Sequence, residues 1–177
     1  MSESSCTSQK TVVVALAGNP NSGKTTIFNS LTGARQHVAN YPGVTVEKVE
    51  GFCNHKGYKL HIVDLPGTYS LSARSLEEII ARRFIVEERP DLVVQVADAS
   101  NLERNLYLAV QIMELGAPIV IALNMSDLAK AQGIEFDLQQ LTRLLGCPLV
   151  PTIGHKGIGR KELLDTILDV ATGRIAV

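Results

Sequence analysis

The chain has 177 residues, 45% of them hydrophobic and 20% charged, and its 17 lysines and arginines almost balance its 18 aspartates and glutamates. This length predicts one domain with a core of its own, and a net charge of −1 argues against a nucleic-acid partner, which would require a basic excess. No apolar run is long enough to span a bilayer, the polar start does not resemble a secretory signal, and the three cysteines lack the spacing of a zinc site or a disulfide framework.

Apolar strands and amphipathic helices are predicted to alternate after a flexible polar tail over residues 1–10. Strands are expected at residues 11–17, 46–52, 58–63, 92–97, 118–123 and 148–150. Helices are expected at residues 25–31, 75–85, 101–115, 137–145 and 162–170. Residues 33–44 are rich in turn formers and are expected to be a long loop, whereas residues 54–57 are expected to close a hairpin.

Uniformly apolar strands that alternate with helices are typical of parallel sheets covered on both faces. The sequence therefore predicts an α/β protein of three layers, with a mostly parallel sheet of six to seven strands and one antiparallel edge strand.

The clearest motif is GNPNSGKT at residues 18–25, a GxxxxGK[ST] pattern between a predicted strand and a predicted helix. Its glycines allow backbone amides to surround a phosphate, and the helix N-terminus adds its dipole. Lys24 would place its charge between the β- and γ-phosphates, and the Thr25 hydroxyl would bind Mg²⁺. The alternative, a glycine-rich turn without a ligand, explains fewer of the matched positions. The residues predicted to contact phosphate are Gly18, Asn19, Asn21, Ser22, Gly23, Lys24, Thr25 and Thr26.

A second motif, DLPG at residues 64–67, directly follows a predicted strand. The Asp64 carboxylate could hold the magnesium shell through water, and Gly67 could approach the γ-phosphate with its amide. Alone, this pattern is a common turn, but its place after a P-loop favours a phosphate-sensing role.

A third motif, NMSD at residues 124–127, indicates which base is read. The Asp127 carboxylate can accept two hydrogen bonds from guanine, which adenine cannot offer in that arrangement. The alternative is a helix N-cap at Ser126 and Asp127. The order of the motifs favours guanine, with Asn124, Met125 and Asp127 as base-binding residues.

Two weaker signals complete the predicted site. Gly43 and Thr45 lie between the predicted P-loop helix and the second predicted strand, where the Thr45 hydroxyl and carbonyl would complete the Mg²⁺ shell and sense the γ-phosphate, unless Thr45 simply opens a strand. Thr152, Ile153 and Gly154 follow the last strand and would offer backbone amides to the guanine oxygen.

In this order the motifs resemble those of a P-loop GTPase with a Ras-like fold, of the translation-factor-related class. Three longer strings narrow the resemblance, namely NYPGVTVE at 40–47, VDLPGTYSL at 63–71 and DASNLERNLYL at 98–108. They are similar to the N-terminal cytosolic G domain of the bacterial ferrous-iron transport protein B (FeoB) family. The resemblance extends over roughly residues 12–170 and implies a G domain at 11–172, followed by a stub of the next segment at 173–177.

Carried over by the resemblance, Thr25, Thr45 and Asp64 would bind Mg²⁺, and Asn124 and Asp127 would read the guanine of GTP or GDP. Thr45 would be the threonine of switch I, and Asp64 would pair with Gly67 in switch II.

The resemblance also implies a catalytic set of Asn21, Lys24, Thr45 and Gly67. GTP hydrolysis in the family is stimulated by K⁺, and Asn21 is expected to help hold that ion near the phosphates. A cation there would neutralise developing charge as an arginine finger does.

Members of the family continue into a helical regulatory domain and a membrane permease domain. The resemblance implies these as partners within the same transporter, which this chain would regulate during ferrous iron uptake at the cytoplasmic face of the bacterial inner membrane. It implies no nucleic-acid partner and leaves the oligomeric state open.

Three departures from the GTPase pattern affect the expected activity. Thr68 stands where many small GTPases have a water-positioning glutamine, which predicts slow turnover. Met125 replaces the usual lysine, which is expected to alter the apolar stem that packs over the base. Thr152 to Gly154 lack the usual Ser-Ala, which is expected to change GDP affinity and release. A nucleotide-gated binding module, a potassium-dependent GTPase of ribosome assembly or tRNA modification, and an adenine-specific ATPase remain as alternatives.

Overall fold

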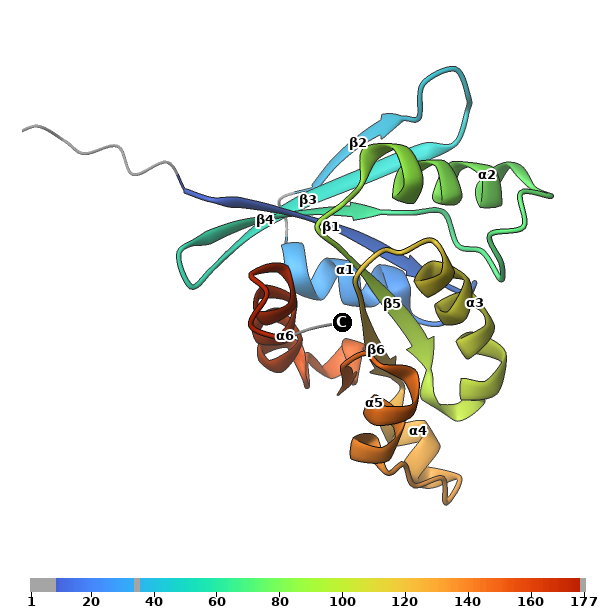
Figure 1. Ribbon diagram of the computed structural model, residues 1–177, viewed down its shortest axis with the longest axis vertical. Helices are drawn as coiled ribbons and strands as arrows, with labels where there is room; N and C mark the ends of the chain where they lie inside the picture. The colour runs from blue at the N-terminus through green and yellow to red at the C-terminus, as the bar shows by residue number, and fades with distance from the viewer. Residues whose placement is uncertain (1–8, 34–35, 176–177) are drawn as a thin grey trace, which may run out of the picture.

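The computed structural model describes residues 9–33 and 36–175 and shows an α/β sandwich (Figure 1). The strands are β1 (Thr11–Gly18), β2 (Gln36–Asn40), β3 (Glu47–His55), β4 (Tyr58–Asp64), β5 (Leu92–Asp98), β6 (Ile119–Asn124) and β7 (Leu149–Pro151). The helices are α1 (Lys24–Thr32), α2 (Leu76–Arg83), α3 (Leu102–Glu114), α4 (Ser126–Ala131), α5 (Leu138–Leu145) and α6 (Arg160–Ala171). Three short turns of other helix types are η1 (Phe84–Glu88), η2 (Ala99–Asn101) and η3 (Gly154–Lys156).

All seven strands form one sheet in the order β2-β3-β4-β1-β5-β6-β7. Neighbours pair in parallel from β4 to β7, and β3 pairs antiparallel with both β2 and β4. The predicted fold class is therefore confirmed, including the antiparallel pairing at one edge. Since β1 lies between β4 and β5, the chain leaves β1 at a point where connections diverge, which is where open α/β sheets bind ligands.

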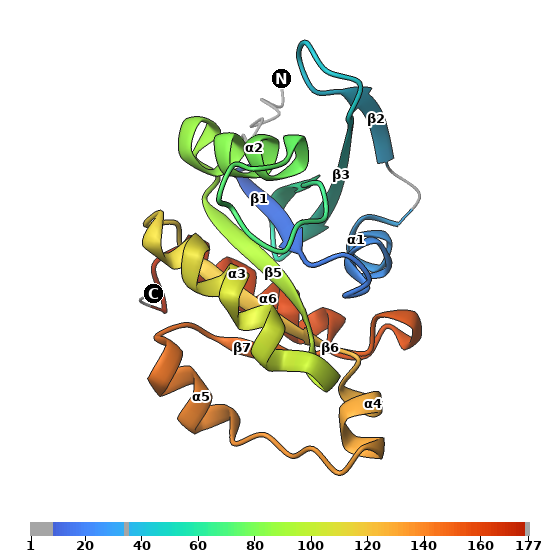
Figure 2. The same cartoon turned by 90° about the vertical axis from the view of Figure 1, so that its right-hand side faces the viewer.

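Alternate side chains of β1 enter two separate hydrophobic cores, as the two-residue period of a strand requires. Val14 and Leu16 pack with Phe28 of α1 and with α6 on one face. Ala15 and Ala17 pack with α2, α3 and the partly buried side of α5 on the other. Figure 2 shows the two helix layers on either side of the sheet. Strand β1 is therefore packed on both faces, which fixes the starting point of the loop that follows it.

Strand β2 corrects the expectation of an irregular loop over residues 33–44. Its sequence, QHVAN, pairs residue by residue with β3, and every one of its side chains is exposed. An edge strand whose two faces are both exposed to solvent shows no alternation of apolar and polar residues, so the hydrophobic pattern did not predict it. Its backbone pairing with β3 decides the structure instead.

Helix α4 is the other element that the sequence pattern did not predict. It is short, and Ala129 is its one buried residue. It begins at Ser126, inside the NMSD motif, but the N-cap that was weighed at Ser126 and Asp127 is not formed, because Met125 precedes the helix and no side chain caps it. Asp127 lies in the first turn and remains partly exposed.

The two ends of the chain are described only in part. Lys10 belongs to the expected tail, yet its carbonyl accepts a hydrogen bond from Lys59 N over 3.0 Å and so prolongs the β1–β4 ladder. After α6, Arg174 N donates to Asp169 O over 2.8 Å, and the chain folds back on that helix. Residues 1–8 of the expected tail and residues 176–177 of the expected stub lie outside the described residues.

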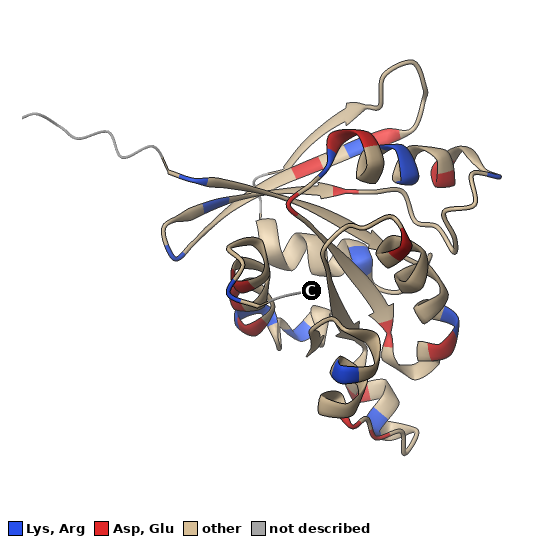
Figure 3. Cartoon of the chain, in the orientation of Figure 1, with Lys and Arg blue, Asp and Glu red and all other residues tan. Residues whose placement is uncertain are grey.

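Charges of both signs are interspersed over the helices (Figure 3). Within residues 9–33 and 36–175, no helix combines the length and the apolar character needed to cross a bilayer.

Candidate nucleotide-binding site

The P-loop residues form the turn from β1 into α1, at the carboxyl edge of the sheet. Gly23 is the residue before the helix and has a φ of +83°, a left-handed conformation that favours glycine. A Cβ on Gly23 would lie 2.3 Å from Asn124 Nδ2, and one on Gly18 would lie 2.8 Å from Ser22 Oγ and from Val96 O. The close approach of neighbouring segments therefore requires glycine at both positions.

No side chain caps the N-terminus of α1. The first backbone amides of a helix have no partner within the helix, and here the residue before the helix is a glycine that has no side chain to accept from them. Thr25 and Thr26 follow in the first turn and are exposed. This uncapped helix end can accept an anion such as a phosphate.

Lys24 and Asp64 form an ion pair at the centre of the site. Lys24 opens α1, and Asp64 is the last residue of β4, where it pairs in register with Leu16 of β1. Their side chains are only 11% and 13% exposed. Burial raises the pKa of the Asp64 carboxyl above its ordinary value, and the Lys24 ammonium counteracts that rise. Each charge therefore offsets part of the cost of burying the other.

Gly67 and Thr68 lie against the P-loop, but the Thr68 side chain points into its own turn. Thr68 N donates to Gly18 O over 3.1 Å, and a Cβ on Gly67 would lie 3.7 Å from atoms of Pro20. Thr68 Oγ1 donates to Ser70 O over 2.7 Å, and Thr68 is only 4% exposed. The Thr68 hydroxyl is thus occupied by a hydrogen bond inside the protein, whereas Gly67 is exposed to solvent.

Asn124 ties together two loops that are far apart in the sequence. Its Nδ2 donates to Ser22 O over 2.9 Å, and its Oδ1 accepts from Gly154 N over 3.0 Å and from Thr152 Oγ1 over 3.4 Å. The side chain is 3% exposed. In this conformation Asn124 positions the P-loop and residues 152–154 relative to each other.

Asp127 lies nearby at the surface and accepts a hydrogen bond from Lys156 Nζ over 3.0 Å. This bond lowers the pKa of the Asp127 carboxyl, although partial desolvation acts in the opposite direction. Met125 adopts a φ of +58°, and its Cε would lie 3.5 Å from a Cβ on Gly23. Its thioether therefore lies close to the P-loop.

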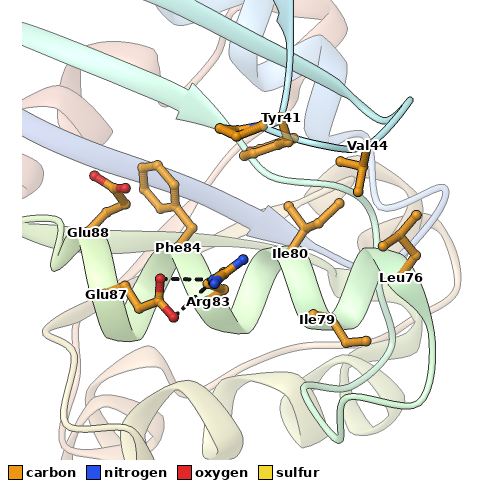
Figure 4. A pocket seen from close by; sticks show the side chains of 10 residues that line it. Tyr41, Val44, Leu76, Ile79, Ile80, Arg83, Phe84, Glu87 and Glu88 are labelled. Carbon is orange, nitrogen blue, oxygen red and sulfur yellow. Dashed lines mark hydrogen bonds and ion pairs between the residues drawn. The ribbon is translucent and has the colours of Figure 1, made fainter.

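The loop that carries Gly43 and Thr45 packs elsewhere. Both residues are exposed, and the Thr45 hydroxyl has no hydrogen bond to another described residue. On either side of Gly43, Tyr41 and Val44 line a groove of about 360 Å³ together with apolar side chains of α2 and η1 (Figure 4). The structure thus does not join Thr45 to the Lys24–Asp64 pair.

Residues that the sequence analysis did not assign to the site line a polar cavity of about 180 Å³ beside the P-loop. Asp98 and Arg104, from the end of β5 and from α3, face Asn19 and Asn21 there. The Arg104 guanidinium lies 4.5 Å from the centre of the Tyr69 ring. Neither polar atom of the buried Asn19 side chain has a partner among the described residues. The sequence pointed to Asp98 and Arg104 only by resemblance, through the string DASNLERNLYL.

The fold and the arrangement of the motifs define a class: a G domain of the P-loop GTPase type. A strand, a P-loop and a helix are followed by a strand-end aspartate and then by NMSD at the end of β6, all at one edge of a mostly parallel sheet.

Comparison with known proteins narrows this class to one family. The family model described as "Ferrous iron transport protein B" matches residues 12–167. The chain is 56% identical, over 91% of its length, to the Fe(2+) transport protein A/Fe(2+) transporter FeoB fusion protein of Porphyromonas gingivalis, and covers 19% of it. The chain therefore belongs to the ferrous iron transport protein B (FeoB) family. It spans about a fifth of the length of the curated relatives that it matches.

Solved structures agree with this assignment. The cytosolic domain of T. maritima FeoB in a GDP form is 46% identical with a TM-score of 0.91, over 94% of this chain and 66% of that one. The FeoB G domain of Methanococcus jannaschii is 48% identical with a TM-score of 0.82, over 92% of this chain and 99% of that one.

Proposed function

We propose that this chain is a slow GTP-hydrolysing switch domain that regulates ferrous iron uptake through a membrane permease. The observation that carries the proposal is the Lys24–Asp64 pair beside the uncapped start of α1, with NMSD at the same edge of the sheet. The T. maritima relative, whose solved structure is in a GDP form, supports it.

In this proposal the exposed amides at the start of α1 bind the phosphates, and Lys24 leaves Asp64 to pair with them. The hydroxyl of Thr25 and the carboxylate of Asp64 are hard oxygen donors, which suit Mg²⁺. Bound Mg²⁺ would neutralise charge on the β- and γ-phosphates. Thr45 and Gly67 would sense the γ-phosphate, and Thr45 must leave its present position to do so.

Thr152, Ile153 and Gly154 are proposed to meet the guanine oxygen, and Asp127 its nitrogen donors. Replacement of Asp127 by Asn should weaken GDP binding on the order of 10²-fold, because an amide presents one donor where two acceptors are needed. Xanthosine diphosphate, whose base carries an oxygen in place of the amine, should gain affinity. Competition for a fluorescent nucleotide measures both changes, and a parallel loss of GDP and xanthosine diphosphate would contradict base reading by Asp127.

The Asn21 amide is proposed to help hold K⁺ at the phosphates. Asn21 is exposed in the P-loop with a φ of +67°, and its side chain has no hydrogen bond to another described residue. Its oxygen is therefore available to a cation that lacks strong directional demands.

Phosphate release should be faster in K⁺ than in Na⁺ for the unmodified chain, by at least about tenfold if the ion acts as an arginine finger does. Asn21→Ala should bring the rate in K⁺ down to the rate in Na⁺. Asn29→Ala, an exposed asparagine further along α1, is the matched control and should keep the K⁺ response. Equal rates in both salts for the unmodified chain would contradict the potassium proposal.

A second candidate function is a nucleotide-gated binding module whose hydrolysis is incidental. Its specific support is the Thr68 hydroxyl, which is buried in its own turn and leaves no side chain there to orient water. Transport by the whole transporter with a non-hydrolysable GTP analogue separates the two functions. Full transport with the analogue would favour the module, and transport that requires hydrolysis would favour the switch.

The partners proposed for residues 11–172 are a helical regulatory domain and the permease domain of the same transporter. The small share of its curated relatives that the chain covers supports this proposal. The site of action would be the cytoplasmic face of the bacterial inner membrane. No nucleic-acid partner is proposed.

A further inference from the structure

The carboxylate of Asp127 is engaged on both oxygens in this structure. Its Oδ2 accepts from Lys156 Nζ over 3.0 Å, and its Oδ1 accepts from Leu128 N over 3.1 Å. Lys156 comes from the loop after β7, so the ion pair joins two segments that both border the base-binding region. A ligand that needs the carboxylate meets a cation already bound there.

The backbone of the 153–159 loop fixes where Lys156 emerges. Ile153 and Ile158 form a β-bridge, with Ile153 N donating to Ile158 O over 3.1 Å. Lys156 N donates to Ile153 O over 3.0 Å within η3, and Gly154 N donates to Asn124 Oδ1. A Cβ on Gly159 would lie 2.2 Å from Pro151 O, so the loop closes tightly at its end. The side chain of Lys156, which is 51% exposed, reaches Asp127 from this anchored position.

We propose that Lys156 determines nucleotide affinity and base specificity by competing with guanine for Asp127. Its ammonium donates to the same carboxylate that guanine would engage through its ring N–H and its exocyclic amine. A guanine nucleotide must therefore displace Lys156 or share a carboxylate that is already partly neutralised. This inference rests on the proposed function, since it requires that Asp127 reads guanine.

The sign of the effect separates this proposal from ordinary electrostatics. A lysine near the site attracts an anionic nucleotide whatever its base, so removal of a merely attractive lysine would weaken binding of GDP and ADP alike. Removal of a competing lysine strengthens binding, and it does so only for a base that uses Asp127.

The test is Lys156→Ala in the chain as it stands, titrated with fluorescent GDP and, by competition, ADP. GDP should bind about two- to fivefold more tightly to the variant, the range expected for one exposed ion pair, and ADP binding should not improve. The gain should shrink at about 1 M salt, where the pair is screened in the unmodified chain. Lys156→Arg should restore the original affinity, because it restores the competing charge.

Lys130→Ala is the matched control. It removes the same charge from α4, the helix that carries Asp127, and Lys130 is exposed without an ion pair in the described part of the chain. A gain in this variant equal to that of Lys156→Ala would overturn the proposal.

Two further results would overturn it. In the first, Lys156→Ala binds GDP no more tightly than the unmodified chain, although the unmodified chain prefers GDP to ADP. This result would leave the proposed function intact. The other is the absence of any such preference in the unmodified chain, which removes the proposed function and this inference together.

Discussion

Lys24→Ala should weaken GDP binding on the order of 10²- to 10³-fold and should also lower the stability of the unliganded chain. The first effect is the loss of a charge that the phosphates would engage, since truncating one partner of a desolvated charge pair costs about 2–5 kcal/mol. The second follows from the structure, because Asp64 would be left 13% exposed without its counter-ion. An unpaired buried polar group costs about 1–3 kcal/mol. Titration calorimetry and urea unfolding measure the two effects separately.

Asp64→Asn is the informative companion variant for Lys24→Ala. It releases Lys24 from its ion pair, so GDP affinity measured without Mg²⁺ should not fall. The double variant with Lys24→Ala and Asp64→Asn should be about as stable as Asp64→Asn alone. Lys24→Ala should also gain stability as the pH falls below neutrality. The folded-state pKa of Asp64 is already raised by burial and would rise further, so the folded state takes up the proton first. Additive losses of stability in the double variant would show that the two side chains are not coupled.

Asn124→Ala should lower the free energy of unfolding by about 2–4 kcal/mol, because it leaves Ser22 O and Gly154 N without their partners in a buried region. For a chain of this size the loss corresponds to roughly 5–15 °C in melting temperature. Nucleotide affinity should fall as well, since the P-loop and residues 152–154 would no longer be held in place. Thermal unfolding monitored by circular dichroism measures the stability change.

Thr152→Val is the control for Asn124→Ala. It removes the longest of the three bonds, 3.4 Å, at nearly constant volume, and should cost less than about 1.5 kcal/mol. Asn124→Asp keeps the acceptor for Gly154 N but removes the donor to Ser22 O, so it should lose stability comparable to Asn124→Ala. If Asn124→Ala proved as stable as the unmodified chain, the buried amide would not be what connects the two loops.

The elements that the sequence predicted well are those whose own residues carry the signal. The strand at Leu92 to Asp98 is apolar except for Gln95 and its last residue, Asp98, and the helix expected from residue 75 is present, with Ser75 capping α2 by accepting from Glu78 N. Strand β2 and helix α4 were not predicted, because neither buries an apolar face of its own. Strand β2 forms because its backbone pairs with β3, and α4 forms where the chain leaves β6.

The candidate site divides in the same way. The sequence by itself determined which groups are present, because a P-loop, DLPG and NMSD are contiguous motifs whose chemistry depends on residue type and local spacing. It also determined the family, through longer strings of the same kind. The tertiary structure alone decided which of these groups meet, because the Lys24 and Asp64 side chains, 40 positions apart, and the Asn124 amide and Ser22 carbonyl, 102 positions apart, come together only when the strand order is set. The Lys24–Asp64 pair, the Asn124 bonds to two loops and the Lys156 contact with Asp127 follow from that order and from no local pattern.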